Sequence, residues 1–310
     1  MMMYKRLNVL LGWVVFAIAT YTYCSTIEPT ASFWDCGEFI ASAFNLEVGH
    51  PPGNPFFMLV GNFFTHFAKD TAHVAVMVNV MSALLSAFTI LFLFWTITHL
   101  TRKIVQEDCA EEPSLAEAIK ILGSGVVGAL VYTWSDTFWF SAVEGEVYAF
   151  SSFLTALVFW LILKWEEVAD KSWSDKWIVL IAYIVGISIG VHLLNLLCIP
   201  AIVLVYYFRK AENVTLKGTM GAVGISFVIV LLALYGLIQG LVEVAGYFEL
   251  FFVNVLGLPF QSGVLFYLLC TIAILIWGVY ETEVQKSPLK MRIPFALSVI
   301  LLGIPFIGSG

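Results

Sequence analysis

Two carboxylates at helical spacing, followed by a histidine, are the side chains of this sequence best suited to chemistry. Asp35 and Glu38 stand three positions apart in FWDCGEFI, and His50 follows in the Pro- and Gly-rich turn GHPPGNP. A helix places residues three apart on one face, where a carboxylate can accept a proton from a hydroxyl group. The alternatives are a solvated acidic face and an incidental turn histidine. The flanking aromatic residues would press the acidic pair against a membrane surface, which favours a functional pair.

A second acidic cluster lies in SDTFWFSAVEGEVYAF. Asp136, Glu144 and Glu146 fall at or beside the mouth of two apolar segments, and a carboxylate at membrane depth is costly enough to indicate function. Asp136 is the most informative of them, because aromatic residues surround it in the sequence. Glu144 and Glu146 have a simpler alternative, a polar turn.

The elements that must position these residues are membrane helices. Of the 310 residues, 60% are apolar and 12% are charged. Soluble domains carry about twice that share of charged residues, which excludes an ordinary soluble protein. The sequence has no basic patch that would neutralise phosphates. We therefore expect a chain integrated in the lipid bilayer, with no nucleic-acid partner.

Apolar runs predict an all-α, polytopic membrane helix bundle of about nine spans. The run 177–208 is too long for one crossing of roughly 20 residues, and cationic residues precede and follow it. Because cationic loops stay on one side, we expect a broken helix hairpin that turns near GISIGVHLLN, where His192 lies. One long tilted helix is the alternative. The other predicted spans are 7–24, 73–98, 119–140, 147–163, 219–239, 264–280 and 293–307.

The cations predict the orientation of this bundle. Of 15 Lys and Arg residues, only Lys69 falls on the side opposite the N-terminus. Since the cationic side is cytoplasmic, we expect a cytoplasmic N-terminus and acidic clusters on the non-cytoplasmic face, which in a bacterium is the periplasmic side of the inner membrane. The outer loop 25–72 then contains two amphipathic juxtamembrane helices, predicted over 33–44 and 55–68.

The motifs FWDCGEFI, VGHPPGNPFF, WFSAVEGEVYAF and GISIGVHLLNLL together resemble a bacterial and animal membrane family that is linked to protein O-mannosyltransferases. More widely, an acidic pair on a juxtamembrane helix followed by a His-Pro-Pro turn is similar to the GT-C superfamily of glycosyltransferases. The resemblance covers about residues 1–240. It implies transfer of a sugar such as mannose from a polyprenyl-phosphate donor to a hydroxyl of an acceptor protein or glycan, at the non-cytoplasmic face.

The resemblance also assigns residues. It makes Asp35 the catalytic residue of the first outer loop and Glu38 its acidic companion. Many GT-C enzymes continue into a soluble outer domain, whereas this sequence ends shortly after the ninth predicted span, so the prediction is a single membrane domain over 1–310 without a soluble C-terminal domain. The expected substrate-binding residues are His50, Asn54, Lys69, Asp136, Glu144, Glu146, Tyr148 and His192.

The charge of the donor phosphate is difficult to neutralise on a face that is predominantly acidic. Lys69 is the only Lys or Arg residue predicted on the outer side. Further positive charge must therefore come from a protonated His50 or His192, from helix N-termini or from a metal ion. We expect a divalent cation, Mg²⁺ or Mn²⁺, since carboxylates suit such ions. The predicted ligands are Asp35, Glu38, Glu144 and Glu146.

Two other functions stay open at this point. One is a membrane transporter whose substrate site lies at the broken helices with His192. A transporter of that kind shows inverted repeats and charged residues deep in several spans, and the sequence displays neither. The other is a structural subunit of an envelope complex that docks through its acidic loops. The motifs favour the glycosyltransferase.

Overall fold

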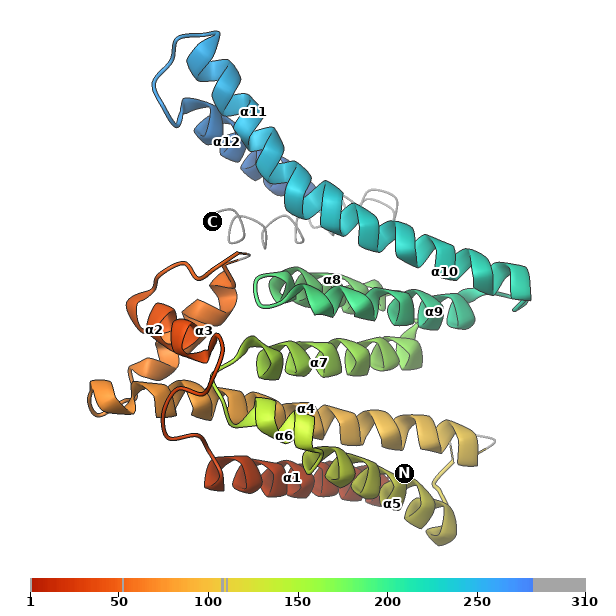
Figure 1. Ribbon diagram of the computed structural model, residues 1–310. Helices are drawn as coiled ribbons and strands as arrows, with labels where there is room; N and C mark the ends of the chain where they lie inside the picture. Colours follow the sequence, from red (N-terminus) through yellow and green to blue (C-terminus); the bar gives the residue numbers. More distant parts are fainter. Residues whose placement is uncertain (1, 52, 107–108, 110, 281–310) are drawn as a thin grey trace.

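The computed structural model describes residues 2–51, 53–106, 109 and 111–280, and over these ranges helices are its only regular elements (Figure 1). The predicted all-α class is thereby confirmed. In the described residues, six helical stretches are long and apolar enough to cross a membrane, against the nine spans expected. They are Met3–Ser25, Thr71–Val105, Leu115–Thr133, Val147–Val168, Leu193–Lys210 and Leu216–Asn254.

The long 177–208 run is divided in the structure. Helix α8 (Asp175–Ile189) ends just before Gly190, the short 3₁₀ helix η2 (Leu193–Leu197) follows, and α9 (Cys198–Lys210) continues from it. Both α8 and α9 pack on the same helix, α7 (Val147–Val168). At 15 residues, α8 is shorter than a typical crossing, which lowers the span count.

The later helices depart from the expected pattern. A span that ends at 239 and another over 264–280 were predicted, but α10 (Leu216–Leu231), the π-helical η3 (Leu232–Gln239) and α11 (Gly240–Asn254) form one continuous helix. Glutamate is a good helix former, so isolated acidic residues in this stretch do not end the helix. Helix α12 (Ser262–Val279) then packs against α11. The predicted span 293–307 lies outside the described residues.

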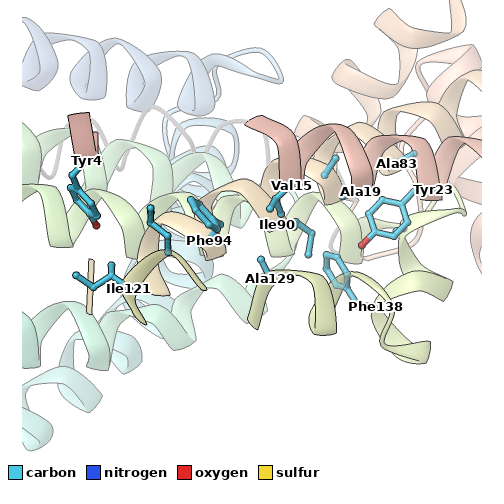
Figure 2. Close-up of a cluster of buried hydrophobic side chains, with 13 residues drawn as sticks. Tyr4, Val15, Ala19, Tyr23, Ala83, Ile90, Phe94, Ile121, Ala129 and Phe138 are labelled. Carbon is cyan, nitrogen blue, oxygen red and sulfur yellow. The ribbon is translucent and has the colours of Figure 1, made fainter. Parts of the chain in front are cut away.

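Helix α4 (Val74–Val105), which follows the short η1 (Thr71–His73), is the centre of the bundle. Helices α1 (Met2–Ser25), α5 (Leu115–Thr133) and α7 pack against it. Small residues let the helices approach closely, and a Cβ on Gly125 would lie 2.5 Å from Cγ2 of Thr98. Figure 2 shows the core cluster shared by α1, α4 and α5, which includes Val15, Ala19, Ile90, Phe94, Ile121 and Ala129.

Charged side chains join helix ends at one end of the bundle, which we call the basic end. Lys103 near the end of α4 pairs with Glu166 near the end of α7. Arg209 near the end of α9 pairs with Asp170, just after α7. Arg102 lies over an aromatic ring at the start of α1, 5.0 Å from its centroid. The start of α1 and the ends of α4, α7 and α9 therefore meet here.

Two short helices cover the opposite end, which we call the site end (Figure 1). Helices α2 (Cys36–Asn45) and α3 (Pro55–Thr65) form where juxtamembrane helices were predicted. They pack against each other and against α4, and a Cβ on Gly61 would lie 2.9 Å from Cβ of Ala43. Their buried apolar side chains join those of α4 in one cluster: Phe39, Ile40, Ala43, Phe57, Met58, Val78 and Met81.

Candidate functional site

Asp35, Glu38 and His50 come together at the start of α2. Oε1 of Glu38 accepts the backbone N–H of His50 at 2.6 Å, and Oε2 of Glu38 lies 3.1 Å from the ring Nδ1 of the same histidine. The other ring nitrogen, Nε2, lies 4.0 Å from Oδ2 of Asp35. The side chains of Asp35, Glu38 and His50 are 54%, 41% and 43% exposed, so a ligand can reach all three.

The local backbone explains how these side chains meet. Trp34 has a positive φ of 65°, which turns the chain just before Asp35. Helix α2 is capped by Leu46, whose backbone is in the left-handed conformation, and such a residue commonly ends a helix. The next turn is closed by the N–H of Gly53, which donates to the carbonyl of His50 at 2.8 Å. The φ of Gly53 is +86°, a value that glycine adopts without steric cost.

Two buried glutamates lie behind this cluster, in the link between α6 (Asp136–Ala142) and α7. Glu144 and Glu146 are 6% and 7% exposed. The carboxylate of Glu144 forms side-chain hydrogen bonds with Ser32 and with Cys36 at the start of α2. Glu146 accepts the N–H of Val147 at 3.0 Å and caps α7. The acidic link is therefore tied both to α2 and to α7.

Burial changes the protonation of these groups. It raises the pKa of Glu146 from 4.5 to about 7; the negative charges of Glu144 and Asp35 add to this rise, and His50 opposes it. Burial likewise raises the pKa of Glu144 and raises the pKa of the Cys36 thiol to about 12. A carboxyl group with a pKa near 7 is partly protonated at neutral pH. Since Asp35 and His50 act on Glu146, the exposed cluster and the buried pair form one electrostatic unit.

The turn that carries the two glutamates packs tightly against α2 and α4. A Cβ on Gly145 would lie 2.9 Å from Oδ1 of Asn79 and 3.1 Å from Cγ1 of Ile40. Asn79 is fully buried, and its Nδ2 donates to the carbonyls of Glu28 at 2.7 Å and Thr30 at 3.0 Å. Helix α4 thus holds the acidic turn and the segment that leads into α2. Sequence reasoning missed Asn79, although an amide within the apolar run VAVMVNVM was the available signal.

A second pair of predicted residues lies beside the acidic link. The ring of Tyr148, in the first turn of α7, is 5.4 Å from the ring of His192. The N–H of Leu194 donates to Nδ1 of His192 at 3.2 Å, and burial lowers the pKa of His192, so its neutral form is favoured. The N–H of Phe56 donates to the carbonyl of Gly190 at 2.9 Å. This bond joins the start of α3 to the turn that carries His192.

The stretch that contains both groups of residues matches a known protein family. Residues 35–215 match the model of the protein O-mannosyl-transferase TMEM260 N-terminal domain. The match covers more than half of the chain and runs from α2 through α9. The chain belongs to this family.

Two relatives illustrate the TMEM260 similarity. The protein O-mannosyl-transferase tmem260 of Dictyostelium discoideum is 25% identical over 204 residues, which are 63% of this chain and 22% of the relative. The protein O-mannosyl-transferase TMEM260 of Mus musculus is 26% identical over 205 residues, 64% of this chain and 26% of the relative. The matches span about a quarter of the length of these relatives. No solved structure matches the chain.

Within the TMEM260-family stretch, three predicted binding residues stand apart from the cluster. Asn54 precedes α3 with a φ of 39°; it is 3% exposed, and its Oδ1 has no hydrogen-bond partner among the described residues. Lys69 is exposed beyond the far end of the 11-residue α3. Asp136 is exposed at the start of α6. The structure therefore brings together Asp35, Glu38 and His50, and gives Asn54, Lys69 and Asp136 no hydrogen bond or ion pair with that cluster among the described residues.

A divalent cation would find one group of ligands in the described part of the chain. One atom each from Asp35, Glu38 and His50 lie within 4.8 Å of one another. The ligand set predicted from the sequence combined the first two residues with Glu144 and Glu146, whose side chains instead form hydrogen bonds inside the protein. Two carboxylates and one imidazole fit Mn²⁺, which accepts nitrogen ligands, better than Mg²⁺, which prefers oxygen.

Proposed function

We propose that the chain is a membrane-embedded protein O-mannosyltransferase, which moves mannose from a polyprenyl-phosphate donor to a Ser or Thr hydroxyl of an acceptor protein. Membership of the TMEM260 family and the names of the relatives support this reaction. The observation that carries the proposal is the cluster of Asp35, Glu38 and His50. It brings an exposed proton acceptor and an imidazole within 4.0 Å of each other.

Asp35 is the base of the proposed reaction. Its side chain makes no capping hydrogen bond to the backbone of α2 and is the most exposed of the three, so it is free to receive a proton. In the transfer step the acceptor oxygen bonds to the anomeric carbon, and the bond from that carbon to the donor phosphate breaks. The hydroxyl proton passes to Asp35, and the phosphate leaves on its lipid.

Glu38 has a different part in this scheme. Its carboxylate is occupied by the backbone N–H and the ring of His50, so it positions the histidine and does not compete as the base. With Nδ1 held by Glu38, a protonated His50 presents its Nε2–H to the donor phosphate. A hydrogen bond from a cationic donor stabilises charge that develops on a leaving group.

As an alternative to the protonated imidazole, a neutral His50 could bind a divalent cation together with Asp35 and Glu38, and that ion would supply the positive charge at the donor phosphate. Asp35 has two carboxylate oxygens, so it can bind an ion with one and accept the proton with the other. Lys69 lies beyond the far end of the 11-residue α3, so we assign the charge at the phosphate to the cluster and not to this lysine.

We place the reaction on the non-cytoplasmic face of the membrane. Cationic loops favour the cytoplasmic side, and the basic end of the bundle joins residues such as Lys103 and Arg209. The site end would then lie on the non-cytoplasmic side, which in a bacterium is the periplasm. The donor and acceptor would meet there, above the buried Glu144 and Glu146.

The transporter and the structural subunit receive less support. Ionisable clusters lie at the two ends of the described bundle, whereas transporters bind their substrates near the middle of the membrane. A structural subunit that only docks a partner does not require a carboxylate paired with an imidazole at an exposed position. The enzyme remains the function that the geometry supports best.

The test is mannose transfer by membranes that contain the chain, supplied with polyprenyl-phosphate mannose and a Ser/Thr-containing peptide. Asp35→Asn is expected to lower the rate about 10²- to 10⁴-fold, the usual contribution of a general base. The control is Glu47→Gln, an exposed carboxylate in the same loop outside the cluster. Normal transfer by Asp35→Asn, at equal protein levels in the membrane, would overturn the assignment of the base.

A further inference from the structure

A cavity of about 900 Å³ opens at the basic end of the bundle, far from the candidate transfer site. Its walls come from the start of α1, the ends of α4 and α7, and α9. On α4, Asn79 at the site end and Trp95 at the cavity are 16 residues apart, a distance of roughly 24 Å at 1.5 Å per residue. The cavity is therefore distinct from the site of the proposed reaction.

The cavity is positively charged. Two glutamates, Glu166 and Glu167, line it together with five Lys and Arg residues, which gives a net charge of +3 with His99 neutral. Lys103 and Lys164 are paired with the glutamates. The cations that line it are Lys5, Arg102, Lys103, Lys164 and Arg209.

Two of these cations retain capacity to bind an anion. Lys5 is exposed and forms no ion pair with any residue that the structure describes. Arg102 uses Nε and Nη2 to reach Gln106 and two backbone carbonyls. A guanidinium has five N–H groups, so those on Nη1 remain. Because Arg102 is fixed by these bonds and by its contact with the Tyr4 ring, its free donors are already oriented.

His99 lies in the wall of the same cavity between two carboxylates. Its Nδ1 lies 3.2 Å from a carboxylate oxygen of Glu167. Its Nε2 is buried and has no hydrogen-bond partner, since the nearest oxygen of Glu166 is 3.8 Å away. Both ring nitrogens therefore face carboxylates and Nε2 is shielded from solvent, so His99 belongs to the wall of the cavity and leaves anion binding to Lys5 and Arg102.

An aromatic strip leads from the cavity along the bundle. On α4, Trp95 lines the cavity, and Phe92 and Phe88 follow on the same helical face. Trp95 lies 5.7 Å from the ring of Trp160 on α7 and 6.3 Å from that of Trp13 on α1. None of these five rings is fully buried. The strip lies on the face of α4 between α1 and α7, which pack on α4 from two sides.

We propose that this cavity binds the phosphate headgroup of an anionic phospholipid from the leaflet at the basic end, with an acyl chain along the aromatic strip. The cations suit a phosphate group, and the continuous apolar strip suits a hydrocarbon chain. A soluble phosphate compound would use the charges but leave the strip bare. The proposal does not depend on the transfer reaction.

The experiment compares lipids bound to the purified chain by native mass spectrometry. The probes are phosphatidylglycerol and phosphatidylcholine with the same acyl chains. Each cation near an anionic headgroup contributes about 1 kcal/mol, or about fivefold. We expect phosphatidylglycerol to bind at least fivefold more tightly than phosphatidylcholine, and the double variant Lys5→Gln with Lys164→Gln to weaken its binding about 25-fold.

The matched control is Lys120→Gln with Lys171→Gln, which removes two exposed cations outside the cavity and is expected to leave lipid binding unchanged. If the first double variant fails to fold, Lys5→Gln alone, at an exposed position, is expected to give about a fivefold loss.

Three outcomes would overturn the proposal. Equal binding of the two lipids would remove the role of the headgroup charge, and equal losses in the two double variants would indicate general attraction to a basic surface. The third uses glycerophosphoglycerol, which is the headgroup without chains, and inorganic phosphate. Displacement of the lipid by either compound at the same concentration would identify a soluble ligand.

Discussion

Glu38 holds His50 at two points, since Oε1 accepts the backbone N–H at 2.6 Å and Oε2 lies 3.1 Å from the ring Nδ1. The two residues are 12 positions apart, so one carboxylate ties the first turn of α2 to the GHPPGNP turn. These hydrogen bonds lower the pKa of Glu38, which keeps the carboxylate charged at neutral pH. The nitrogen that remains, Nε2, is the one near Asp35.

Two substitutions of Glu38 should therefore lower the rate of transfer by different amounts. Glu38→Gln keeps an oxygen for the backbone N–H of His50 and loses the charge, so transfer should fall about 10-fold. Glu38→Ala loses both contacts, so the rate of transfer should fall about 100-fold, which is the upper range for a residue that orients another. Steady-state rates should show the loss in kcat, with little change in KM for the acceptor. Glu47→Gln is the control, and equal losses in the two Glu38 variants would contradict the double contact.

Protonation of Glu146 should make stability depend on pH. Its pKa is about 7 in the folded chain and 4.5 as the ordinary value, so the folded state binds the proton more tightly. The stabilisation is complete below about pH 4.5 and is lost as pH rises through 7. Its size is at most about 3 kcal/mol, at 1.36 kcal/mol for each unit of pKa.

Thermal unfolding of the purified chain at pH 5 to 8 tests this dependence. Glu146→Gln resembles the protonated form at every pH, so it should melt at a higher temperature than the unchanged chain at pH 8 and at a similar temperature at pH 5. If the melting temperature of Glu146→Gln falls with rising pH as steeply as that of the unchanged chain, another group causes the pH dependence.

Gly145 should tolerate no side chain, because a Cβ there would lie 2.9 Å from Oδ1 of Asn79 and 3.1 Å from Cγ1 of Ile40. Gly145→Ala is expected to destabilise the chain by about 1–3 kcal/mol through overpacking. Gly123 is the matched position, since it lies on an exposed part of α5 and a Cβ there would meet nothing within 4 Å. Gly123→Ala should stabilise the helix by up to about 1 kcal/mol. Melting temperatures that move in the same direction would refute this packing argument.

The sequence predicts the site end of the fold better than the later helices. The spacing of Asp35 and Glu38, the Pro- and Gly-rich turn and the apolar runs are local signals, and local signals determine where helices start and turn. The continuous helix from Leu216 to Asn254 has no comparable marker. Apolar runs interrupted by single glutamates are compatible with a loop and with a helix, and packing decides between them.

The burial of the second acidic cluster also lies beyond sequence reasoning. The sequence predicts Glu144 and Glu146 at the mouth of two apolar segments, with a polar turn as the alternative, and does not show which residues would cover them. They are buried because the turn packs on Asn79 of α4, a contact between residues more than 60 positions apart in the chain. Such pairings depend on how helices assemble, so the raised pKa of Glu146 could not be foreseen.

Asn79 should be the structural support of the segment that carries Asp35. Its Nδ2 donates to the carbonyls of Glu28 and Thr30, so Asn79→Ala leaves two acceptors without a donor and should cost about 1–3 kcal/mol. Asn79→Leu restores the volume but not the donors. Both variants should therefore increase proteolytic cleavage within residues 26–35 and lower kcat for transfer. Ser124→Ala, which removes an exposed hydroxyl on α5, should change neither. Protection from proteolysis in the Asn79→Leu chain would show that Asn79 acts by filling space, because leucine can replace its volume but not its hydrogen bonds.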